Sequence, residues 1–149
     1  MAKVSLASML EGETSKEERQ EGMKSAGASG TKQTIPALLF KARTDAQLTH
    51  LKQPNRTLAL HKALEMFYDD VVGMADTYIE TTMGIYPDFS LDEVEESKVI
   101  DNPLQYFRGL YDAIEKNRTS VKETFLQNQI DEMQQLIAHT LYRLQFITT

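Results

Sequence analysis

The fold is decided by one stretch, residues 55–84, which reads NRTLALHKALEMFYDDVVGMADTYIETTMG. Asn55 can cap the start of a helix, and Gly84 is a residue type that commonly ends one. The apolar residues between them recur at steps of three and four, the period of an amphipathic helix. They are Leu64, Tyr68, Val71, Val72, Ala75, Ile79 and Met83. The stretch therefore predicts a long helix over residues 56–83.

A shorter helix is predicted before this stretch. Thr34 can act as its cap, and Pro36 lies in its first turn, where a missing N–H costs least. An irregular apolar stripe then continues toward Pro54. Its members are Leu38, Leu39, Ala42, Leu48 and Leu51. We expect this helix to cover residues 36–52.

A long connection and two further helices are predicted after Gly84. Residues 84–102 include Tyr86-Pro87 and an acidic run, and they are long enough to travel the length of a bundle. Asn102 and Pro103 then start a helix over 103–117, and the last helix covers 121–146. The expected core positions of these two helices are Leu104, Phe107, Leu110, Tyr111, Ile114, Phe125, Leu126, Met133, Leu136, Ile137, Leu141 and Leu144.

This order of elements predicts an all-α protein. Two helices, a long crossover and two more helices form the connectivity of a ferritin-like four-helix bundle, although a generic helical bundle produces the same pattern. We expect the bundle to span residues 34–149 with neighbouring helices antiparallel. Eight side chains are expected inside it: Leu64, Tyr68, Val72, Ile79, Phe107, Ile114, Met133 and Leu144.

Residues 1–33 predict an extended N-terminal arm. They contain four glycines and few apolar residues after Leu10, and their basic and acidic side chains balance. The arm is expected either to be flexible or to dock on a neighbouring subunit. A neutral arm is poorly suited to holding DNA.

Composition narrows the classes of partner. The net charge of −6 argues against a nucleic-acid-binding surface, and the absence of cysteine excludes disulfides and thiolate metal ligands. No apolar run approaches the length needed to span a bilayer, so no membrane association is expected.

Candidate metal ligands flank the apolar stripe of the long helix. His61, Glu65, Asp76 and Glu80 lie along it or at one edge, and imidazole and carboxylate groups bind iron or zinc without thiolates. The alternative is that the carboxylates are a solvated edge paired with Lys62 or an arginine, and that His61 is an ordinary core residue. Asp76 lies fifteen residues after His61, about 22 Å along a helix, so one ion cannot join them within one chain. A site therefore requires an antiparallel second copy of this helix.

Other chemistry is not indicated. His139 follows Glu132 by seven residues and does not form the Glu-x-x-His pair of an intrasubunit di-iron centre. There is no phosphate-binding glycine loop, nucleophile elbow or zinc-hydrolase motif.

The segment LTHLKQPNRTLALHKALEMFYDDVVGMADTYIE, residues 48–80, resembles the junction of the first two helices in Dps-type mini-ferritins. His61, Glu65, Asp76 and Glu80 match the ligand positions of that pattern. His50 matches its first histidine after one residue is removed near Pro54, and the usual Trp and Gly are replaced by Leu51 and Lys52-Gln53. The resemblance implies an intersubunit iron site with His61 and His50 from one subunit facing Asp76 and Glu80 from the other.

A second resemblance covers residues 36–147. HKAL…FYDDVVGMAD…E and the closing phrase NQIDEMQQLIAHTLYRLQFI are similar to a ferritin-like family encoded largely by tailed bacteriophages. This resemblance implies the cytoplasm of an infected bacterium, or the virion, as the location.

The leading hypothesis is a non-enzymatic, homo-oligomeric bundle of phage origin, a virion-associated structural or assembly component with no cofactor. Its arm would contact other assembly proteins. The long arm and the altered first-histidine motif favour this hypothesis. The alternative is a Dps-like mini-ferritin that binds and oxidises iron at a dimer interface.

Overall fold

The computed structural model describes residues 34–52 and 57–147, and within these ranges all regular structure is helical. The four helices are α3 (Ile35–Lys52), α4 (Leu58–Ile85), α5 (Pro103–Arg118) and α6 (Thr124–Phe146). The prediction of an all-α helical bundle is thus confirmed over these ranges. The predicted arm, residues 1–33, and the predicted cap Asn55 lie outside them.

Local side-chain bonds explain where two of the helices begin. Thr57 caps α4 by accepting a 3.1 Å hydrogen bond from the Leu60 N–H. Asn102 caps α5 in the same way, accepting from the Gln105 N–H at 3.1 Å, with proline in the first turn. The Asn102-Pro103 start is therefore confirmed, because both residues satisfy the helix end as expected.

Five predicted boundaries differ from the structure by one to three residues, and the end of α4 and the start of α6 have a clear local cause. Gly84 does not adopt a positive φ, so α4 continues to Ile85 and ends where the Tyr86 N–H bonds the Thr82 carbonyl at 2.8 Å. The last helix begins at Thr124 instead of residue 121, because Val121 is buried in the preceding turn and its N–H bonds the Arg118 carbonyl.

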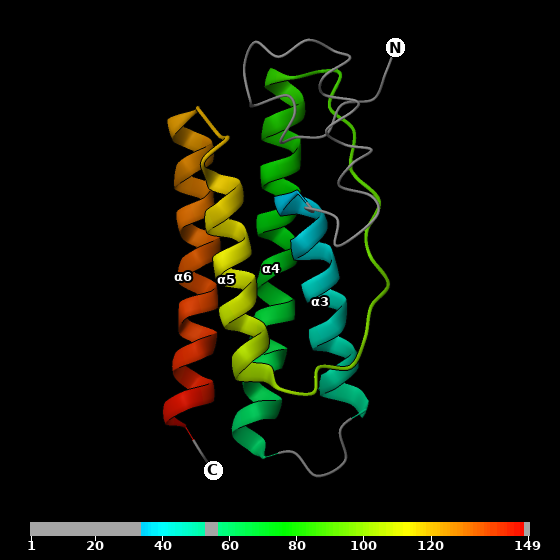
Figure 1. Cartoon of the computed structure of the whole chain (residues 1–149), viewed down its shortest axis with the longest axis vertical. Coiled ribbons are helices and arrows are strands. Elements are labelled where there is room, and N and C mark those ends of the chain that lie inside the picture. Colours follow the sequence, from blue (N-terminus) through cyan, green and yellow to red (C-terminus); the bar gives the residue numbers. More distant parts are fainter. Residues whose placement is uncertain (1–33, 53–56, 148–149) are drawn as a thin grey trace.

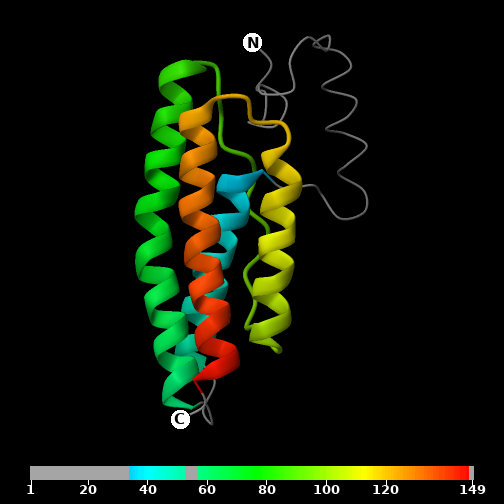
Figure 2. The ribbon, with the colours of Figure 1, turned by 90° about the vertical axis from the view of Figure 1, so that its left-hand side faces the viewer.

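The helices are arranged as two antiparallel pairs (Figures 1 and 2). In Figure 1, α3 descends and α4 ascends, the crossover returns the chain to the lower end, α5 ascends and α6 descends. Contacts join α3 to α4, α4 to α6 and α5 to α6, with a smaller contact between α3 and α5. The long helix α4 therefore belongs to both halves of the bundle.

Aromatic packing lies at the centre of the core. Phe67 of α4 meets Phe107 of α5 edge to face, with ring centroids 4.8 Å apart and planes at 74°. Both side chains are fully buried. The inward face of α4 is formed by Leu64, Phe67, Val71, Ala75, Tyr78 and Thr82.

The predicted core was wrong at several edge positions. Of the eight expected interior residues, Leu64, Phe107, Ile114 and Met133 are buried, Tyr68, Ile79 and Leu144 are half-buried, and Val72 is exposed. The apolar stripe of α4 is wider than the face that meets the bundle, so Val72 and Met83 fall on its outer edge. Other residues expected inside but exposed are Leu51, Tyr111 and Phe125.

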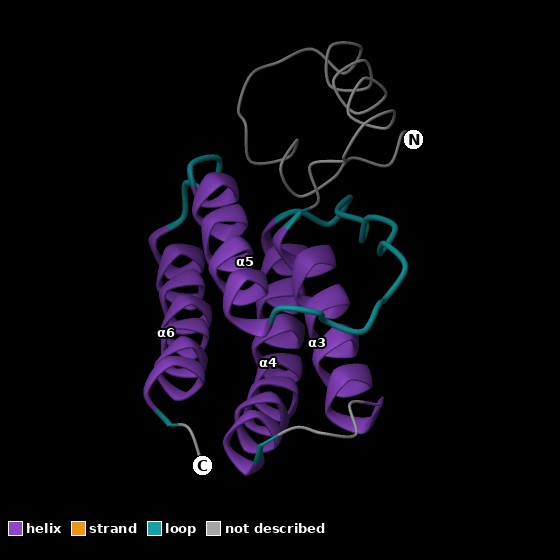
Figure 3. Ribbon diagram, turned by 60° about the horizontal axis from the view of Figure 1, so that its bottom comes forward, coloured by secondary structure: helices purple, strands orange, loops and turns teal. Residues whose placement is uncertain are grey.

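The crossover between α4 and α5 runs past α3 (Figure 3), and side chains of α3 bond its backbone. Asp45, which is 1% exposed, accepts the Lys98 N–H at 2.7 Å, and Thr49 accepts the Ile100 N–H at 2.8 Å. Asp45 also accepts the Tyr106 hydroxyl at 2.6 Å and pairs with Lys41. The N–H groups of Lys98 and Ile100 thus both have side-chain acceptors on α3, and these bonds hold the irregular segment in place.

None of the described helices is both long and apolar enough to cross a membrane.

Candidate metal site

The turn between α3 and α4 brings two histidines together. His50 lies in the last turn of α3 and is 7% exposed, and His61 lies in the first turn of α4. Their rings stack with centroids 3.8 Å apart and planes inclined by 30°. Two imidazoles that the sequence separates by eleven residues therefore form one cluster.

A backbone carbonyl fixes the orientation of the His50 ring. Its Nδ1 lies 3.2 Å from the carbonyl oxygen of His61. Because a carbonyl oxygen only accepts, Nδ1 carries the proton and Nε2 of the neutral ring keeps its lone pair. Metal-binding histidines in proteins commonly use their second nitrogen in this way.

Glu65 lies one turn after His61 on α4. Its carboxylate is bonded by the Lys62 ammonium group at 2.7 Å. That hydrogen bond lowers the pKa of Glu65, burial opposes the change, and the charge of Lys62 also lowers the pKa. The carboxylate is therefore already paired with a cation on its own helix.

Tyr68 is a neighbour that sequence reasoning assigned only to the core. Its ring meets His50 edge-on, with centroids 5.3 Å apart. Burial raises the pKa of its hydroxyl, and the charges of Asp69 and Glu65 add to the effect. Tyr68 lies seven residues, or about two turns, after His61 on the same face of α4. This spacing is the sequence signal from which its place near the histidines could have been predicted.

The remaining two predicted ligands lie apart from this cluster. Asp76 and Glu80 are exposed and one turn apart in the second half of α4. Within residues 34–52 and 57–147, no three His, Asp or Glu side chains converge as a metal site. One chain therefore holds two partial sets: the stacked pair of His50 and His61 with Glu65 one turn along α4, and the Asp76 and Glu80 pair.

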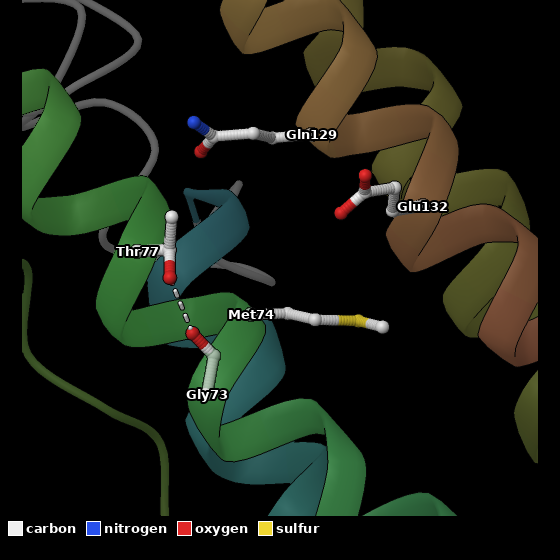
Figure 4. Close-up of a pocket in the computed structure, with 5 residues that line it drawn as sticks. All are labelled: Gly73, Met74, Thr77, Gln129 and Glu132. Carbon is white, nitrogen blue, oxygen red and sulfur yellow. Dashed lines mark hydrogen bonds between the residues drawn. The ribbon is translucent and has the colours of Figure 1, made fainter.

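A pocket between α4 and α6 does not supply an alternative site (Figure 4). It has a volume of about 140 Å³ and is lined by Gly73, Met74, Thr77, Gln129 and Glu132. The Thr77 hydroxyl donates to the Gly73 carbonyl at 2.9 Å, and the Met74 side chain points toward α6. Glu132 is the single charged group among these five residues, which is too little to hold a cation.

Comparison with known proteins gives a family but no characterised relative. Residues 50–144 match the model of DUF5856, which is described as a family of unknown function. No curated protein and no solved structure matched the chain. The match begins at His50, ends at Leu144 and covers more than half of the sequence. The chain therefore belongs to this family of unknown function.

Proposed function

We propose that the protein is a homo-oligomeric, ferritin-like bundle that binds a divalent metal ion, ferrous iron first, between two antiparallel copies of α4. The observation that carries this proposal is the stacked pair of His50 and His61, in which the His50 ring is oriented by a carbonyl. The sequence favoured a structural role because of the long arm, the altered first-histidine motif and the missing DNA-binding charge. The contact of His50 with His61 bears on the second of these grounds, because it places the two histidines together despite the altered motif.

The outer face of α4 is self-complementary about one two-fold axis. An axis passing between Asp70 and Val71 sets Glu65 level with Asp76 of a second copy. The same axis sets His61 level with Glu80, and Leu58 level with Met83. This register places Glu65 opposite Asp76 and Leu58 opposite Met83, whereas His61 and Glu80, about 100° apart around the helix, lie toward opposite edges of the interface.

Exposed apolar surface on this face supports the pairing. Leu58 is 65% exposed, Met83 43% and Val72 37%. At about 100° per residue, Leu58, Glu65, Asp76 and Met83 point within about 20° of one another. Burying a Leu or Met side chain stabilises an interface by about 1.5–3 kcal/mol, so these residues give the two copies a reason to associate.

The paired carboxylates support a cation at the interface. Packed helices lie about 8–10 Å apart, so Glu65 and the opposing Asp76 approach each other closely. Two like charges in this arrangement repel unless a cation lies between them. Imidazole beside carboxylate favours iron or zinc over magnesium. Bound ferrous iron would be the substrate of a one-electron oxidation in which an oxidant from solution, such as dioxygen or peroxide, accepts the electron.

Anaerobic titration with ferrous iron tests the proposal. We expect one ion per set of ligands, or two per dimer, with binding lost in His61→Ala and in Asp76→Ala. His139→Ala is the matched control, because His139 is an exposed histidine on α6. Absence of binding to the parent protein would refute the proposal.

A structural role as an assembly or virion component is the second candidate. The observation that favours it is a further group of exposed apolar side chains at the end of α6, where Tyr142 is 55%, Phe146 67% and Ile147 43% exposed. This surface suits contact with another protein. The resemblance to phage-encoded proteins gives the virion as the setting.

Removal of residues 2–30 tests this second candidate. We expect the shortened chain to remain a folded, soluble domain that no longer assembles with its partners. Unfolding of the shortened chain would place those residues in the core and contradict the proposed boundary.

A further inference from the structure

Lys62 occupies a position that the metal-binding proposal does not use. It lies between the ligands His61 and Glu65 in sequence, and its ammonium group bonds the Glu65 carboxylate at 2.7 Å. A metal ion that takes Glu65 as a ligand must compete with this ammonium group. The ion pair is exposed, with 58% of the Lys62 side chain and 33% of the Glu65 side chain accessible, so it can be displaced.

The two-fold register brings a second carboxylate to Lys62. Lys62 and Glu80 are eighteen residues apart, a whole number of helical turns, so they lie on the same edge of α4. In an antiparallel two-fold pair, each edge of a helix lies beside the same edge of its copy. Lys62 is level with Ile79 of the second copy, and therefore within about 1.5 Å of the level of that copy's Glu80.

We propose that Lys62 is the resident cation of the α4 interface: it holds Glu65 and the opposing Glu80 when no metal is bound, and an incoming metal ion displaces it from Glu65. This inference rests on the proposed function and adds to it a residue that sets metal affinity. The lowered pKa of Glu65, caused first by its hydrogen bond with Lys62, is consistent with a carboxylate already paired with a cation.

The two states of the interface then differ in which cation neutralises the carboxylates. Without metal, the two Lys62 side chains of the dimer offset part of the charge of six acidic groups, which are Glu65, Asp76 and Glu80 of each copy. With metal, the ion takes Glu65, Asp76 and an imidazole, and Lys62 keeps only Glu80. Lys62 thus lets the dimer persist without metal and lowers the affinity for metal.

Lys62→Gln separates these effects. Under anaerobic conditions with ferrous iron alone, we expect Lys62→Gln to bind the ion about two- to fivefold more tightly than the parent, because the competing charge is gone. In the presence of a metal chelator, the dimer dissociation constant of Lys62→Gln should be about three- to tenfold higher than that of the parent. Adding ferrous iron should abolish this difference between the two proteins.

Two further variants control the experiment. Lys62→Arg keeps the charge and should behave like the parent in chelator. Lys122→Gln removes the same charge from an exposed position before α6 and should change neither quantity. Iron binding by the parent with no gain in Lys62→Gln would overturn the role of Lys62 and leave the metal site intact. No iron binding by the parent would overturn both proposals.

Discussion

The imidazole of His50 lies 3.8 Å from that of His61, centre to centre, although the two residues belong to different helices. Nδ1 of His50 donates to the His61 carbonyl, so the contact fixes both the ring and its tautomer. Replacing His50 with Phe should keep the ring packing against Tyr68 and remove the nitrogen ligand. We therefore expect the circular dichroism spectrum to match the parent, while iron affinity falls at least tenfold in anaerobic titration. Unchanged affinity would exclude His50 from the ligand set.

The aromatic pair in the core gives a prediction about stability. Phe107→Ala removes a fully buried ring that meets Phe67 edge to face, so it should cost about 3–5 kcal/mol of unfolding free energy. Phe125→Ala is the matched control, because Phe125 is 47% exposed, and it should cost less than about 0.5 kcal/mol. Urea denaturation of both variants measures the difference. Equal losses would mean that Phe125 is buried in the protein in solution.

Asp45 should be more important for stability than its position in a helix suggests. Asp45→Ala leaves the Lys98 N–H and the Tyr106 hydroxyl without their acceptor in a buried place, at a cost of about 2–4 kcal/mol. Tyr106→Phe removes one donor only and should cost about 1–2 kcal/mol. Urea denaturation at neutral pH should show a larger loss of unfolding free energy for Asp45→Ala than for Tyr106→Phe. The reverse order would contradict the role of the Asp45 carboxylate as the shared acceptor of these bonds.

Two glycines within helices offer a stabilising change and a probe of the α4 surface. A Cβ atom added at Gly73 in α4 or at Gly109 in α5 meets no atom within 4 Å. Each Gly→Ala change should therefore stabilise its helix by about 0.5–1 kcal/mol, which thermal unfolding of a monomeric variant can measure. Leu58→Glu, which places a charge on the proposed interface, provides that monomeric background. If the α4 pairing requires close approach at Gly73, Gly73→Ala should also weaken the dimer, whereas Gly109→Ala should not.

Tyr86 predicts a change in stability at alkaline pH. Its hydroxyl donates to Glu123, and this bond, with burial and the Glu123 charge, raises its pKa from 10.0 to about 12. The unfolded chain loses this proton first, so the contribution of Tyr86 to stability is complete below pH 10 and falls between pH 10 and about 12.

Tyr86→Phe should remove that part of the pH dependence. We expect the variant to be less stable than the parent at pH 8, with the gap narrowing as pH rises toward 12. Urea midpoints measured across this range give the comparison. If the difference in stability between the two proteins stayed constant across this pH range, ionisation of Tyr86 would not break a stabilising bond to Glu123.

Sequence patterns predicted the helices well and their surroundings less well. Asn102 and Pro103 act through bonds within one turn, so the start of α5 was predictable from neighbouring residues. Val72 and Phe125 were placed inside because a stripe of apolar residues does not reveal how wide the contacting face is. Tertiary packing sets that width.

The polar parts of the fold were hidden for a similar reason. Asp45 reads as an ordinary surface aspartate until a segment more than fifty residues later brings Lys98 and Tyr106 to it. The candidate ligands were easier to find, because His61, Glu65, Asp76 and Glu80 share one helix and a fixed period. The contact of His50 with His61 depends on the turn between two helices, which the period does not describe.

The attachment of the crossover to α3 has a kinetic consequence. The bonds from Lys98 to Asp45 and from Ile100 to Thr49 span 53 and 51 residues, so they close loops far longer than the turn that joins α3 to α4. Closing such a long loop costs conformational entropy that is offset only once the bonds have formed. The local helical hairpins therefore fold first. We expect the amide protons of Lys98 and Ile100 to gain protection from hydrogen exchange late in refolding, after those of α3 and α4. The crossover would then be the last part of the bundle to reach its native position.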